Sequence, residues 1–84
     1  LDSMPTELDE LNRRVMQLEI EETALKKEDD RLSQERLADL QKELAELRDE
    51  FAAQKAQWEN EKASVDRLSK LREEITERVS GASE

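Results

Sequence analysis

The side chains of this chain that could take part in chemistry are almost all carboxylates. Of its 84 residues, 23 are Asp or Glu, and there is no His and no Cys. The commonest general base, the commonest zinc ligands and the Ser-His and Cys-His nucleophile pairs are therefore missing. The only glycine is Gly81, so no glycine-rich loop is available to hold a phosphate group. Because solvated carboxylates are ordinary surface groups, we expect neither enzyme activity nor a bound cofactor.

The most concentrated group of acids is Glu28-Asp29-Asp30. A calcium loop of the helix–loop–helix type needs acids at alternate positions, a glycine at the sixth position and a bidentate Glu at the twelfth. This stretch has neither that spacing nor that glycine, so the sequence predicts no metal site there. Its acids are expected to form a solvated turn or an electrostatic contact for a basic surface.

These acids lie within residues 28–37, a polar stretch that interrupts an otherwise regular heptad pattern. A short polar break between two heptad runs predicts a helix that turns back on itself, and one continuous helix through 28–36 is the alternative. Polar residues Glu22 and Gln54 occupy two seam positions, either as tolerated defects or as residues that fix the register. The predicted coiled-coil seam consists of Leu8, Leu11, Val15, Leu18, Leu25, Leu37, Leu40, Leu44, Leu47, Phe51 and Trp58.

The predicted fold class is all-α, an antiparallel coiled-coil hairpin within a single unit, residues 1–84. We expect a first helix over 5–27, a tip over 28–32, a second helix over 32–79 and a frayed tail over 80–84. Asp30 is the first candidate for the cap of the second helix, and Ser33 is a later candidate. At 1.5 Å per residue the first helix is roughly 33 Å long and the second roughly 70 Å long. The short first helix therefore packs on only the first half of the long second helix.

The uncovered part of the second helix carries its own apolar stripe. Such a stripe must be buried against another surface, so we expect the chain to self-associate as an antiparallel dimer or tetramer through this half. Trp58, next to the stripe, is expected either to pack in the seam or to mark where an additional helix joins. The stripe consists of Val65, Leu68, Leu71, Ile75 and Val79.

Composition sets the remaining limits. Charged residues make up 44% of the chain and hydrophobic residues 35%, too few for a conventional globular core but enough for a narrow seam. Disorder is the other interpretation of such a composition, and the strict apolar periodicity argues against it. The net charge of −9 makes binding to nucleic acid or to an anionic membrane surface unfavourable. The lack of Cys is compatible with the cytoplasmic location that we expect.

An ordered set of short matches makes the chain similar to the middle domain of the ClpB family of AAA+ protein disaggregases. The set spans about residues 2–79, and its most specific parts are the Asp-Ser-x-Pro start, the Leu-Glu-Ile-Glu stretch, the Ser-Gln-Glu-Arg-Leu restart and the isolated Trp58. The matching stretches are Asp2-Ser3-Met4-Pro5, Glu7-Leu8-Asp9, Arg13-Arg14, Gln17-Leu18-Glu19-Ile20, Ala24-Leu25-Lys26-Lys27-Glu28, Ser33-Gln34-Glu35-Arg36-Leu37, Leu40, Glu43-Leu44, Trp58 and Glu61-Lys62.

The resemblance implies a regulatory role. In this family the middle domain is a coiled-coil propeller on the outside of a hexameric, ATP-driven ring that threads aggregated polypeptides together with the DnaK chaperone. Contacts between neighbouring middle domains repress the ring, and DnaK releases it. By analogy, residues 4–58 form the first wing, and the expected regulatory contact involves Glu28, Asp29, Asp30, Arg31 and Arg36. The DnaK site is expected to lie outside this chain, and ATP would bind only in ATPase modules that the chain lacks.

A structural rod, either a spacer or a dimerisation segment, is the competing hypothesis. Heptads without catalytic residues are common in such rods, and composition alone favours one. A hairpin would favour the ClpB-type wing over the rod. The rod is instead expected to form an unbroken parallel dimer.

Overall fold

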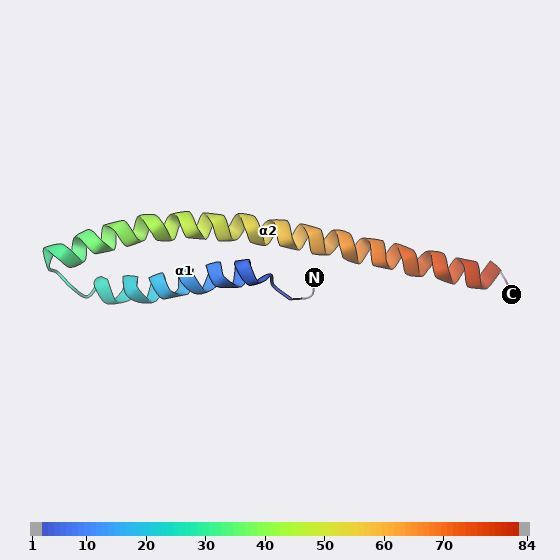
Figure 1. Cartoon of the computed structure of the whole chain (residues 1–84), viewed down its shortest axis with the longest axis horizontal. Helices are drawn as coiled ribbons and strands as arrows, with labels where there is room; N and C mark the ends of the chain where they lie inside the picture. The colour runs from blue at the N-terminus through green and yellow to red at the C-terminus, as the bar shows by residue number, and fades with distance from the viewer. Residues whose placement is uncertain (1–2, 83–84) are drawn as a thin grey trace.

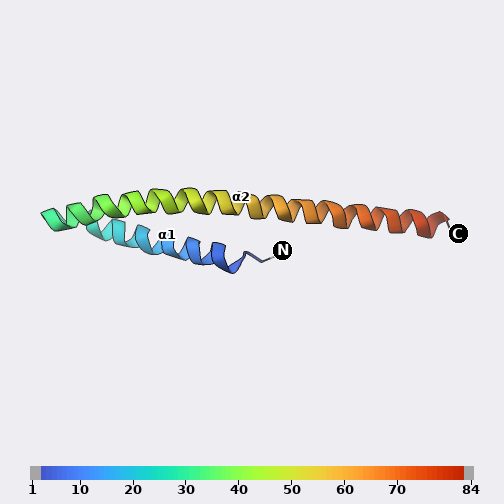
Figure 2. The same cartoon turned by 45° about the horizontal axis from the view of Figure 1, so that its top comes forward.

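The chain folds back on itself as two antiparallel helices. The computed structural model describes residues 3–82 and contains helix α1, Thr6–Leu25, and helix α2, Arg31–Ala82. In both views α1 lies along the first half of α2, and the rest of α2 extends beyond it (Figures 1 and 2). The resulting rod measures 79 × 16 × 15 Å. The predicted all-α antiparallel hairpin is therefore confirmed.

Helix α1 begins after a proline and ends without a glycine. Pro5 has a φ of −55° and a ψ of 145°, and its carbonyl oxygen accepts the first helical bond from the Asp9 N–H at 3.0 Å. At the other end, Lys27 and Glu28 donate to carbonyl oxygens three residues back, at 3.2 and 3.1 Å, which tightens the last turn. No described residue has a positive φ, so this turn needs no glycine.

Helix α2 is capped by Asp30, the first of the two candidates that the sequence offered, and not by Ser33. The carboxylate Oδ2 of Asp30 accepts the Ser33 N–H at 3.0 Å, and its carbonyl oxygen accepts the Gln34 N–H at 3.1 Å. The bond to the Asp30 carboxylate satisfies the Ser33 N–H, which has no acceptor within the first turn of the helix. Since residues 26–30 are not helical, the alternative of one continuous helix through 28–36 is wrong.

Helix α2 also runs further than expected, to Ala82 instead of residue 79. The frayed tail predicted over 80–84 is therefore wrong for residues 80–82, and residues 83–84 lie outside the described part of the chain. Gly81 is the only residue there with poor helix propensity, a cost of about 1 kcal/mol, and it keeps a negative φ instead of ending the helix.

The core is a single seam between α1 and the first half of α2. Its centre is a cluster of Val15, Leu18, Leu40 and Leu44, each at most 7% exposed. Leu25 and Leu47 pack against this cluster, and every residue of the predicted seam is buried or half-buried. Beyond α1, the stripe residues of α2 are between 46% and 65% exposed.

Candidate functional site

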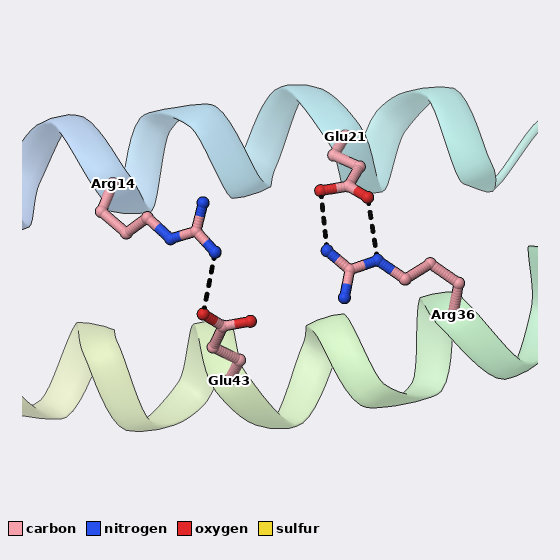
Figure 3. Close-up of polar contacts among 4 residues, drawn as sticks. All are labelled: Arg14, Glu21, Arg36 and Glu43. Atoms are coloured by element: carbon pink, nitrogen blue, oxygen red, sulfur yellow. Dashed lines mark hydrogen bonds and ion pairs between the residues drawn. The ribbon is translucent and has the colours of Figure 1, made fainter.

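Ion pairs along both sides of the seam hold the two helices in register. The guanidinium of Arg36 donates two hydrogen bonds to the carboxylate of Glu21, at 2.9 and 3.0 Å (Figure 3). One heptad further from the turn, the Arg14 guanidinium donates a hydrogen bond to the Glu43 carboxylate at 3.0 Å (Figure 3). The Arg36 guanidinium holds the pKa of Glu21 below its ordinary value, and the Glu21 carboxylate raises the pKa of Arg36. Such pairs set partner choice and orientation in coiled coils.

The heptad positions of these four residues are the sequence signal for the pairs. Glu21 and Arg36 each immediately precede a seam position, as Arg14 and Glu43 do, so all four flank the seam on the same side. Antiparallel helices bring such flanking positions together. On the opposite side, Arg48 lies 3.9 Å from Glu19.

The acidic tip, Glu28-Asp29-Asp30, lies exposed at one end of the rod. Hydrogen bonds from Ser33 hold the pKa of Asp30 below its ordinary value and so favour the charged carboxylate. Arg31 follows directly and pairs with Glu35 at 3.0 Å. The tip therefore presents three carboxylates next to one arginine on the surface.

Arg36, which the sequence grouped with the acidic tip, pairs with Glu21 of the facing helix. It lies in the second turn of α2, and its guanidinium reaches across the hairpin to Glu21 (Figure 3). Its heptad position explains this pairing. Arg36 flanks the seam, and a side chain at such a position lies against the facing helix.

The two polar seam residues have different surroundings. Glu22 is half-buried and accepts a hydrogen bond from Gln41 of the facing helix at 3.2 Å. Gln54 is also half-buried, but it donates to Glu50 of its own helix at 3.1 Å. Glu22 therefore joins the two helices, which is the behaviour expected of a residue that fixes the register, and Gln54 does not.

Trp58 marks the point at which α1 stops covering α2. It is half-buried and lines a hollow with Pro5, Leu8 and Gln54. Its indole Nε1–H is buried and has no hydrogen-bond partner in the described part of the chain. The Lys62 ammonium lies 5.8 Å from the centre of the indole ring. The indole thus packs in the seam at its last covered position and keeps an unused donor.

Residues 3–82 contain no group of three or more acidic side chains placed to hold a metal ion. Within the same residues, no helix is long and apolar enough to cross a membrane. The features that remain in these residues are a hairpin joined by ion pairs, an acidic tip and an exposed stripe, which together define a coiled-coil hairpin.

Comparison with known proteins shows what this hairpin is similar to. The chain is 60% identical to the chaperone protein ClpB of Enterococcus faecalis and 56% identical to that of Bacillus cereus, each over 75 residues. It is 51% identical to ClpB of Nitratidesulfovibrio vulgaris over the same length. Each match covers 89% of this chain and 9% of the relative. The chain is thus homologous to one segment of the chaperone protein ClpB.

The chain spans about 9% of the length of these curated relatives. No family model matches it, and no solved structure matches it.

Proposed function

We propose that this hairpin is a regulatory wing of a cytoplasmic, ATP-dependent protein disaggregase of the ClpB type. In this role it controls the ATPase and threading activity of a hexameric ring through contacts between neighbouring middle domains, and DnaK relieves that control. The observation that supports the proposal is the match to ClpB over 75 residues, which include the acidic tip.

The hairpin has the mechanical properties that such a wing needs. The cluster around Leu40 and Leu44 and the pairs beside it make the covered half one stiff unit with a fixed register. The acidic tip lies at the end of this unit, so a contact made there would be transmitted along the whole rod. Exposed ion pairs are weak and salt-sensitive, so a partner protein could displace them and release the ring.

The test is made in a full-length ClpB ring that carries this hairpin. Glu28→Gln, Asp29→Asn and Asp30→Asn are introduced together, which removes three charges while Asn preserves the cap of α2. The matched control is Glu46→Gln, Asp49→Asn and Asp66→Asn, which changes the same residue types at exposed sites on α2. The ATPase rate is measured with and without DnaK.

We expect the tip variant, and not the control, to have a higher basal ATPase rate and a weaker dependence on DnaK. Equal rates for the tip variant and the unmodified ring would reject a repressing contact at the tip. An equal rise in both variants would show a general effect of charge instead of a specific contact.

A further inference from the structure

The ion pairs beside the seam follow a repeat whose next position holds two acids. The two pairs in Figure 3 lie one heptad apart on both helices. From Arg14 and Glu43, the same step away from the turn leads to Glu7 and Glu50. These two glutamates line one hollow at the end of the hairpin away from the turn, which we call the open end. The third position therefore brings like charges together where the first two bring opposite charges together, and like charges repel.

The seam is also interrupted at the open end. Gln54 lines one hollow with Leu8 and a second hollow with Leu11. Its amide donates a hydrogen bond to Glu50 of its own helix at 3.1 Å. Leu8 is 2% exposed, but the apolar cluster at the centre of the seam does not include it. Leu8 therefore packs apart from the main core, with a polar side chain beside it.

Ion pairs between the two helices involve only the part of α1 from residue 14 onward. Within residues 3–82, the α1 members of these pairs are Arg14, Glu19 and Glu21. Closer to the open end, Asp9 pairs with Arg13 of its own helix at 3.1 Å. Charge therefore holds α1 to α2 towards the turn and opposes their contact at the open end.

We propose that the open end is a release point built into the hairpin, where residues 6–11 of α1 separate from α2 while the rest of the hairpin stays closed. Separation relieves the repulsion between Glu7 and Glu50. It also lets water reach the Trp58 Nε1–H, which is buried without a hydrogen-bond partner in the described part of the chain. The burial of Leu8 opposes separation, so the closed form is the more populated of the two.

The release does not depend on the proposed regulatory role. The cluster around Leu40 and Leu44 and the ion pairs beside it remain closed, so the acidic tip keeps its place on a stiff unit. The change is confined to the far end of α1, where Leu8 and Trp58 become accessible together. The hairpin therefore has one fixed end and one end that opens locally.

The first test separates local release from opening of the whole hairpin. The amides of residues 10–12 bond to carbonyl oxygens within α1, so their hydrogen exchange reports the opening of this end. Exchange is measured by NMR at several low urea concentrations. We expect exchange at residues 10–12 to be faster than around Leu18 and to depend less on urea, because a local opening exposes less surface. The same rate and urea dependence at both places would show that α1 leaves α2 as a whole, and the proposal would be wrong.

The second test changes a charge on α2 and measures opening in α1, which distinguishes release from simple fraying of a helix end. Glu50→Lys replaces the repulsion of Glu7 by an attraction. The matched control is Glu46→Lys, which makes the same change of charge one turn away, at an exposed site that lines neither hollow. We expect Glu50→Lys to slow exchange at residues 10–12 by about two- to fivefold, the effect of an exposed charge pair, and Glu46→Lys to leave it unchanged. Equal slowing by both variants, or none by Glu50→Lys, would overturn the proposal.

A final comparison assigns the effect to the two facing glutamates. In the Glu50→Lys chain, Glu7→Gln should restore the faster exchange. In the unmodified chain the same substitution should speed exchange less, because it also removes a repulsion. Both chains lose the interaction of Glu7 with the N-terminus of α1, so this contribution cancels. An equal effect of Glu7→Gln in both chains would mean that the two side chains do not interact, and the release point would then have no electrostatic basis.

Discussion

The two halves of α2 have the same local character and different environments. Both are rich in good helix formers, and both follow the same heptad. In the first half Leu40 and Leu44 are completely buried, and in the second half Leu68 is 63% exposed and Ile75 53% exposed. The difference arises from α1 alone, which is long enough to cover only one of the two halves. Helix propensity therefore explains why α2 is a helix, and only packing explains which part of it is stable.

This contrast should be largest in amide hydrogen exchange. Amides around Leu40 and Leu44 can exchange only when the hairpin opens, whereas those between residues 61 and 79 need only local fraying of an unsupported helix. We expect exchange in the second region to be faster by several orders of magnitude at low micromolar concentration. Exchange rates measured residue by residue by NMR provide the check.

Self-association through the stripe would reduce the difference in amide exchange between the two halves of α2. If two copies cover each other's stripe, protection between residues 61 and 79 should rise with protein concentration, and protection around Leu44 should stay constant. Uniform protection along α2 at the lowest concentration would contradict the division into a covered and an exposed half.

Truncation of a single leucine in each half gives the next largest effect. Leu44→Ala removes a completely buried side chain and should lower the free energy of unfolding by about 2–5 kcal/mol. Leu68→Ala removes an exposed side chain from the second half of α2 and should change the free energy of unfolding by less than about 0.5 kcal/mol. Urea unfolding followed by circular dichroism at low micromolar concentration measures both. Equal losses would mean that α2 is stabilised uniformly along its length.

The sequence predicted the seam, the turn and the uncovered stripe because each depends on periodicity. Leu18 and Leu44 repeat with the heptad, and the polar break at Glu28-Asp29-Asp30 interrupts it. The sequence did not predict those contacts that depend on a choice between several possible partners. Arg36 lies close to the tip along the chain, but it binds Glu21, fifteen residues away, because the hairpin register brings the two side chains together. The predicted end of α2 at residue 79 is also wrong, because the helix continues to Ala82 and Gly81 keeps a negative φ within it.

The ion pair between Glu21 and Arg36 should give a smaller effect that depends on pH. The pKa of Glu21 is lowered in the folded state from its usual 4.5, so the pair contributes stability above that pH and loses it as the pH falls through the lower folded value. Glu21→Gln should therefore lower the melting temperature by a few degrees at pH 7 and have no effect in strong acid. Added salt should reduce the difference at pH 7.

Glu46→Gln is the matched control for this variant, because Glu46 is exposed on the covered half of α2. It should leave the melting temperature unchanged at both pH values. A loss for Glu21→Gln that persists in acid would mean that the glutamate acts through packing and not through its charge.

The smallest effect should come from substitutions of Asp30. This residue both caps α2 through a hydrogen bond and contributes a negative charge to the tip, and two variants separate these functions. Asp30→Asn keeps a side-chain oxygen for the Ser33 N–H, whereas Asp30→Ala leaves that amide without its acceptor. We expect the Ala variant to lower the melting temperature slightly and to increase amide exchange in the first turn of α2, and the Asn variant to leave both unchanged. Because both variants remove the charge, a similar loss in both would show that the charge, and not the hydrogen bond, stabilises the start of α2. The Asn variant could then no longer be used to remove the charge of the tip without disturbing the fold.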